Sequence, residues 1–209
     1  MSGVCGRAGC RTNPWSGTAG GAQRGRLATA WAASGGTAWA VCDGVAWAVA
    51  EGLASSDRVA MFGWSYGGYA ALVAASRTPQ VYQCVIAGAA VTDPEMQVNY
   101  YRYRLRGRSK VEQLRMWDDS VAPINEVDQV NVPILLIHGT VDQRVPLDHA
   151  KKYRRALLRA EKDHSYLELK GADHFSNTLF FDHKLSLYAS ILDYLSGDCR
   201  NGTVTPATD

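Results

Sequence analysis

The sequence predicts an α/β protein in which a mostly parallel β-sheet carries helices on both faces. From residue 43 onward, short apolar segments typical of strands alternate with segments of helical periodicity, and this alternation indicates a parallel sheet. The apolar run at residues 132–138 is continuous, as expected for a strand that is buried on both faces. A lone serine between glycines, Ser65, stands where a predicted strand is followed by a predicted helix.

The first half of this pattern begins with a helix over residues 43–52, with Asp43 as its N-cap. A short buried strand is predicted at residues 58–64. It is followed by a helix of small residues at 66–79, which ends at a proline. Residues 82–91 form a second apolar strand. The polar and aromatic excursion at residues 93–131 is too long for a plain connection and is interpreted as a cap.

The second half continues the alternation after the buried strand at 132–138. Residues 147–163 have an apolar stripe with cationic residues opposite, which is typical of an amphipathic helix. A strand at 165–170 and a final helix at 178–197, ending at a glycine, complete the pattern. We therefore assign residues 43–198 to one catalytic domain and residues 199–209 to a frayed tail.

Composition and charge exclude several classes of protein. A chain of 209 residues with 46% hydrophobic residues fits one globular domain. The net charge of +2 is too small to indicate a nucleic-acid or lipid partner, and no apolar run has the length of a membrane span. The cationic, tyrosine-containing run at residues 101–110 is expected to belong to the cap rather than to a nucleic-acid surface. No secretory signal is recognisable, so we expect a soluble, cytoplasmic protein.

The five cysteines have neither the spacing of a zinc site nor that of a disulfide-rich domain. We therefore expect no metal, no cofactor and no disulfide framework.

Residues 1–42 differ from the rest of the chain. They contain no acidic residue and no Lys, His, Ile, Phe or Tyr, whereas Ala and Gly fill 18 of the 42 positions. Three interpretations fit this head: a targeting peptide, a disordered arm, or a translation of GC-rich DNA outside the natural reading frame. We favour the third.

The segment Gly63-Trp64-Ser65-Tyr66-Gly67 has the form G-x-S-x-G, placed between a predicted strand and a predicted helix. This turn forces the serine into a strained conformation and presents its hydroxyl at the N-terminus of the helix, where negative charge is stabilised. Side chains at the flanking glycines are expected to collide with the neighbouring strand and helix. Ser65 is therefore the candidate nucleophile. A serine in a glycine-rich turn without a catalytic role is the alternative.

A serine nucleophile needs a base and an orienting acid. Asp142 follows the strand at 132–138, and His174 follows the strand at 165–170. In open α/β sheets the site lies at the carboxyl ends of the strands, so we expect Ser65, Asp142 and His174 to meet there. The chain order Ser, Asp, His is that of the α/β-hydrolase arrangement.

Other acids and histidines are weaker candidates. Asp93 also follows a strand and is the alternative acid, whereas Asp148 is expected to cap a helix. His138 is expected to be structural. Solvated positions are expected for three histidines, namely His149, His164 and His183.

The segments at residues 57–72, 132–146 and 171–175 resemble the nucleophile, acid and histidine segments of prolyl-oligopeptidase-like serine peptidases (peptidase family S9). The resemblance runs from about residue 43 to residue 198. It implies an α/β-hydrolase fold with Ser65 as nucleophile, Asp142 as acid and His174 as base. It also implies that the backbone N–H of Tyr66 belongs to the oxyanion hole.

The chain also departs from that family. The family's propeller, its additional sheet strands and its His-Gly-Gly segment with a nearby tyrosine find no counterpart, so we expect a fold that is truncated on the N-terminal side. Loss of one oxyanion donor lowers the rate by about 100- to 1000-fold. A small sheet would also expose apolar surface, which a homodimer or the head would cover.

These observations are compatible with two alternative functions. The first is a serine hydrolase that acts on short peptides or small esters. The second is a truncated, weakly active or non-catalytic relative that serves as a binding module.

Overall fold

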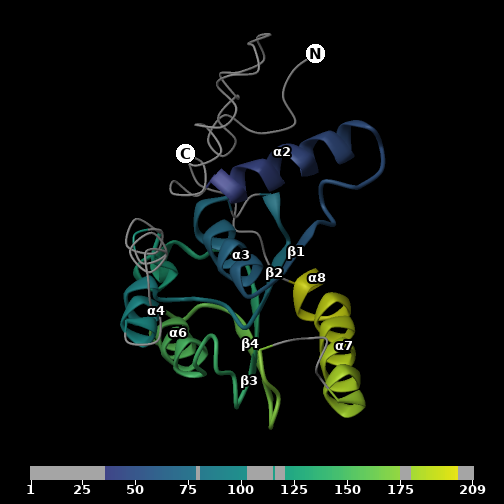
Figure 1. The fold of residues 1–209 in the computed structure, drawn as a ribbon. Helices are drawn as coiled ribbons and strands as arrows, with labels where there is room; N and C mark the ends of the chain where they lie inside the picture. Colours follow the sequence, from purple (N-terminus) through teal and green to yellow (C-terminus); the bar gives the residue numbers. More distant parts are fainter. Residues whose placement is uncertain (1–35, 79–80, 103–114, 116–120, 175–179, 202–209) are drawn as a thin grey trace, which may run out of the picture.

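The computed structural model describes residues 36–78, 81–102, 115, 121–174 and 180–201. Its centre is a four-stranded parallel sheet in the order β1-β2-β3-β4. The strands are β1 (Ala60–Trp64), β2 (Cys84–Gly88), β3 (Ile134–Gly139) and β4 (His164–Leu169). Figure 1 shows the strands in the middle of the molecule, with α4 and α6 on the left and α7 on the right. The predicted α/β class and parallel sheet are confirmed.

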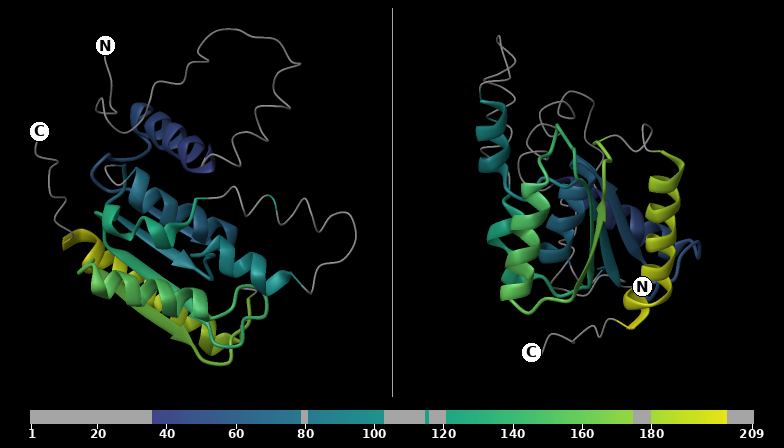
Figure 2. Two further views of the ribbon diagram at one scale, coloured as in Figure 1. Left: turned by 90° about the vertical axis from the view of Figure 1, so that its left-hand side faces the viewer. Right: turned by 90° about the horizontal axis from the view of Figure 1, so that it is seen from below.

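Helices cover both faces of the sheet, as predicted. Figure 2 shows α3 (Tyr66–Arg77) and α6 (Asp148–Arg159) on one face and α7 (Phe181–Ser196) on the other. The short helix α8 (Asp198–Asn201) follows α7.

The strand side chains divide between the two faces with the period of two that a strand imposes. In β3, Ile134 and Leu136 join the core under α3 and α6, whereas Leu135 and Ile137 join the core under α7. Every residue of β2 and β3 is buried. The continuous apolar run predicted for β3 is therefore explained by burial on both faces.

The first described helix, α2 (Gly36–Ala50), begins earlier than the sequence predicted. Asp43 lies inside this helix and is not its N-cap. The helix extends toward the N-terminus because no proline stands at residues 36–42 to interrupt it and because Ala38 and Ala40 favour helix. The helix packs on α3 (Figure 1).

The excursion between β2 and β3 is described only in part. It contains α4 (Pro94–Tyr101) and two short 3₁₀ turns, η2 (Pro123–Asn125) and η3 (Val127–Gln129). Residues 103–114 and 116–120 of the predicted cap, like residues 1–35 of the head and residues 202–209 of the tail, lie outside the described residues.

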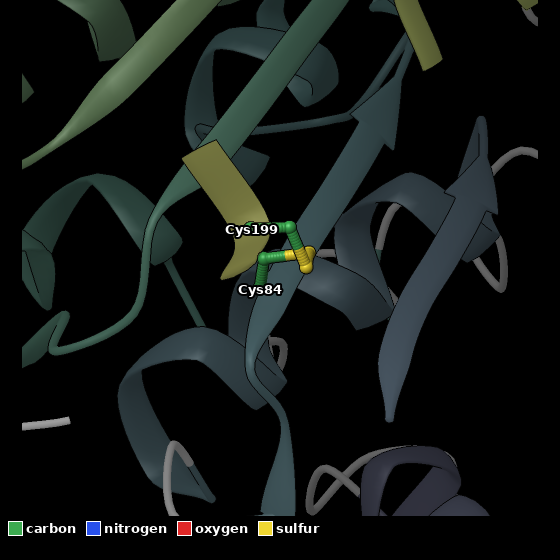
Figure 3. Close-up of a disulfide and its surroundings, with 2 residues drawn as sticks. All are labelled: Cys84 and Cys199. Carbon is green, nitrogen blue, oxygen red and sulfur yellow. A yellow bond between two sulfur atoms is a disulfide. The ribbon is translucent and has the colours of Figure 1, made fainter. Parts of the chain in front are cut away.

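A disulfide joins Cys84, the first residue of β2, to Cys199 in α8 (Figure 3). No disulfide framework was expected from the sequence, and this single bridge was not foreseen. The two cysteines are 115 residues apart, and no local spacing reveals a bridge that depends on where the C-terminal helix docks. Disulfides persist in oxidising compartments. The cytoplasmic location stays a prediction.

Apolar side chains are exposed at the β1 edge of the described sheet, where Phe62 is 54% exposed. No helix in the described part of the chain is both long and apolar enough to cross a membrane.

Candidate active site

Ser65 lies in the sharp turn between β1 and α3. Its backbone has φ 60° and ψ −116°, a conformation that is uncommon for residues other than glycine. Such strain costs about 1–3 kcal/mol. The turn is tied to the neighbouring strand, because the Ser65 N–H donates to Gly88 O at 2.8 Å. The predicted strained turn is thus present.

The glycines around Ser65 differ in whether a side chain would fit at their positions. A Cβ on Gly63 would lie 2.0 Å from Gly67 O, and a Cβ on Gly68 would lie 2.5 Å from Gly88 O. Both positions therefore require glycine. A Cβ on Gly67, in contrast, would meet nothing within 4 Å among the described atoms. The expected collision at Gly67 was wrong, because this residue faces open space in the first turn of α3.

Asp142 follows β3 and is 5% exposed. Its Oδ1 accepts hydrogen bonds from the backbone N–H groups of Arg144 and Val145, at 2.8 and 2.9 Å. Burial acts to raise the pKa of this carboxyl, but the hydrogen bonds from His174 and from these two N–H groups outweigh it and hold the pKa below the usual value. Asp142 is therefore a carboxylate near neutral pH.

His174 connects the acid to the serine and is 6% exposed. Its Nδ1 lies 2.7 Å from Asp142 Oδ2, and its Nε2 lies 2.8 Å from Ser65 Oγ. Because a carboxylate only accepts hydrogen bonds, Nδ1 carries the proton of the neutral ring. Nε2 then accepts from the Ser65 hydroxyl. The structure thus brings together the three residues predicted from the sequence.

Trp64 contributes a contact that sequence reasoning missed. Its indole Nε1 donates to the backbone carbonyl of His174 at 2.7 Å. A Cβ on Gly88 would lie 2.0 Å from Trp64 Cε3, so the indole packs directly against Gly88. Trp64, the residue before Ser65, therefore also holds the segment that carries His174.

The rival acid is engaged elsewhere. Asp93 caps α4 by accepting from the Met96 N–H at 3.1 Å, and it forms an ion pair with Lys152. Burial opposes ionisation, but these hydrogen bonds hold the pKa of Asp93 below its usual value. Asp148, expected to be an N-cap, is the first residue of α6, after Leu147 at the cap position.

The other histidines lie outside the hydrogen-bonded chain. His138 is buried, as expected for a structural residue, and its Nε2 lies 2.8 Å from Val145 O. His149 was expected to be solvated, but it is fully buried. The reason is that the start of α6 packs against the segment after β2. In that segment the Thr92 N–H donates to His149 Nδ1 at 3.2 Å. His164 and His183 bind the main-chain carbonyls of Lys162 and Lys170.

Tyr66 is the first residue of α3, next to Ser65. The N–H groups of a first helical turn point out of the helix end and, with the helix dipole, favour an anion there. Within the described residues, no group of His, Cys, Asp and Glu side chains has the arrangement of a metal site.

Comparison with known proteins gives consistent results. The model of the prolyl oligopeptidase family matches residues 31–201. Bovine prolyl endopeptidase FAP is 30% identical over 139 residues, which are 66% of this chain and 18% of that protein. Bovine dipeptidyl peptidase 4 is 31% identical over 118 residues, which are 56% of this chain and 15% of that protein.

Among solved structures, the uncomplexed acylaminoacyl peptidase of Pyrococcus horikoshii superimposes with a TM-score of 0.61 at 19% identity. The match covers 78% of this chain and 27% of that one. This likeness shows the fold. The chain spans less than a fifth of the length of the two bovine relatives.

Proposed function

This chain belongs to the prolyl oligopeptidase family, and on that premise we propose that it is a serine hydrolase that cleaves short peptides or small carboxylic esters through an acyl-enzyme on Ser65. The observation that supports this proposal is the continuous hydrogen-bonded chain from Ser65 Oγ through His174 to Asp142 Oδ2. A carboxylate, an imidazole and a hydroxyl in this order can activate the hydroxyl as a nucleophile.

The first half of the reaction forms the acyl-enzyme. Ser65 Oγ attacks the substrate carbonyl carbon while its proton passes to His174 Nε2. The imidazolium is then stabilised by Asp142. The oxyanion of the tetrahedral intermediate lies at the N-terminus of α3, where the Tyr66 N–H donates to it. His174 returns the proton to the leaving amine or alcohol as the carbonyl re-forms.

The second half regenerates the serine. Water loses a proton to His174 and attacks the acyl carbonyl, and collapse of the second tetrahedral intermediate expels Ser65 Oγ, which takes the proton back. The products are a carboxylic acid and a free hydroxyl on Ser65. No cofactor enters any step.

The substrate class rests on two arguments. The relatives carry the names prolyl endopeptidase and dipeptidyl peptidase, which supports short peptides as substrates. An alcohol is a better leaving group than an amine, so a small activated ester should react faster than a peptide wherever oxyanion stabilisation is weak.

The test uses a fluorophosphonate probe, which phosphonylates an activated serine. Wild type should be labelled, and Ser65→Ala should not. Ser55→Ala is the matched control, because Ser55 donates to a carboxylate, Asp57, but the structure gives it no contact with an imidazole. Asp142→Asn should lower kcat with p-nitrophenyl acetate by about 10⁴-fold.

Equal labelling of wild type and Ser65→Ala would refute the assignment. An absence of both labelling and turnover in the wild type would favour the binding module instead. If the wild type is labelled, comparing its hydrolysis of p-nitrophenyl acetate with that of aminoacyl p-nitroanilides decides between ester and peptide preference.

A further inference from the structure

The turn that follows Asp142 is held by side chains at three successive carbonyl oxygens. Two of these oxygens face α4, whose tyrosine hydroxyls and glutamine amide donate to them, and the third faces the interior, where a histidine lies. The contacts are Tyr100 to Gln143 O at 2.9 Å, Gln97 and Tyr101 to Arg144 O at 2.9 Å each, and His138 to Val145 O at 2.8 Å.

His138 is the buried member of this set. It lies near the end of β3, it is 1% exposed, and Val145 beside it is also buried. Because a carbonyl oxygen only accepts hydrogen bonds, Nε2 of His138 carries the proton and donates it. Burial lowers the pKa of His138 below its usual value, which keeps the ring neutral near pH 7.

Val145 links this histidine to the carboxylate. Its N–H donates to Asp142 Oδ1 at 2.9 Å, while its carbonyl accepts from His138. Restraining Val145 therefore restrains Oδ1, and the second oxygen, Oδ2, is left to face His174 Nδ1. The Nε2 atom of His138 also lies 3.6 Å from Oδ2, so its N–H dipole lies beside the carboxylate.

We propose that His138 is a positioning residue for Asp142 that acts through the Val145 carbonyl and so sets the geometry of the Asp142–His174 hydrogen bond. The inference rests on the proposed function, because it matters for catalysis only if Asp142 orients His174. It gives a functional role to a side chain that burial alone would mark as part of the core.

The matched variants are His138→Gln and His138→Leu. A glutamine amide nitrogen lies about as far from the backbone as histidine Nε2, so it can still donate to Val145 O, but it cannot ionise. Leucine fills the site without a donor. An uncompensated buried carbonyl costs enough to change a rate by about tenfold. His164→Leu is the control, because His164 also binds a main-chain carbonyl but at the amino end of β4.

Two readouts are measured at pH 7.5. The first is the second-order rate of fluorophosphonate labelling, together with kcat and KM for p-nitrophenyl acetate. The second is the deshielded ¹H NMR signal of the proton between His174 Nδ1 and Asp142 Oδ2, which does not depend on turnover. His138→Leu should label about tenfold more slowly, with kcat reduced and KM unchanged, and should lose or shift the signal. His138→Gln and His164→Leu should match the wild type in both.

A folded His138→Leu protein with the labelling rate and proton signal of the wild type would overturn the proposal, as would a folded His138→Gln as impaired as His138→Leu. If His138→Leu does not fold, His138→Asn replaces it, because its shorter amide cannot reach Val145 O. An unlabelled wild type would instead refute the proposed function, while the proton signal would still report whether His138 positions Asp142.

Discussion

Breaking the Cys84–Cys199 disulfide should lower the free energy of unfolding substantially and leave the chemistry of the site intact. The bridge closes a loop with a sequence separation of 115 residues. For a loop of this length the chain-entropy relation gives about 16 cal/mol/K, or about 4.8 kcal/mol at 25 °C, as an upper limit. For a chain of this size, that corresponds to a fall in Tm of roughly 10–20 °C.

The bridge and the site lie at opposite ends of the same strand. Cys84 is the first residue of β2, and Gly88, which accepts from the Ser65 N–H, is the last. The four residue-to-residue steps from Cys84 to Gly88 place the two ends about 13 Å apart. At a temperature well below both unfolding midpoints, the reduced protein should therefore be labelled by fluorophosphonate at the rate of the oxidised protein.

The assay is urea denaturation, followed by tryptophan fluorescence, of the oxidised protein, the phosphine-reduced protein and the Cys84→Ala/Cys199→Ala variant. Replacement of the other three cysteines, Cys5, Cys10 and Cys42, by serine is the control, and it should preserve the redox difference. Mass spectrometry establishes the thiol state. A loss of less than about 1 kcal/mol in a fully reduced sample would refute the loop-closure reasoning, and a parallel loss of labelling would refute the separation of bridge and site.

Three further predictions concern single residues. Trp64→Phe removes the donor to the His174 carbonyl and should lower kcat about tenfold; a kcat equal to that of the wild type would show that the indole bond does not hold the histidine. Gly63→Ala should destabilise the fold by about 1–3 kcal/mol in urea denaturation, because its Cβ meets the Gly67 carbonyl. Gly67→Ala should be neutral. Equal losses of unfolding free energy in the two variants would contradict the geometry of the turn. Burial lowers the pKa of His149 from 6.5 to about 3, so the unfolded chain takes up a proton below pH 6.5 that the folded chain does not. Stability should therefore fall by about 2 kcal/mol between pH 7.5 and 5, and His149→Asn, which retains an acceptor but cannot ionise, should flatten that dependence; an unchanged slope would assign it to other groups.

The parts of the fold and site that could be predicted from the sequence are those determined by local pattern and chain order. The strained turn at Ser65 follows from the glycines and from the change of period from strand to helix. The positions of Asp142 and His174 follow from a rule of topology, because residues after parallel strands collect at one edge of the sheet. The family model matches residues 31–201, a range that includes these segments.

The features that sequence reasoning missed depend on distances between elements. The Trp64 indole reaches a carbonyl 110 residues away, and Cys84 reaches a cysteine 115 residues away. Neither contact produces a periodic pattern in the sequence. The burial of His149 is a similar case, because its position on α6 predicts exposure until the segment after β2 packs on it.

The strained backbone at Ser65 needs support from structure that cannot relax around it. That support comes from both sides of the turn: the Ser65 N–H is bound by Gly88 O in β2, and the Ser65 carbonyl accepts from the Tyr69 N–H in α3. The strand β2 is fully buried, whereas β1 is half exposed within the described sheet. The geometry of Ser65 therefore depends less on its own strand than on the neighbouring one, so a change that loosens β2 should disturb Ser65 more than an equal change in β1.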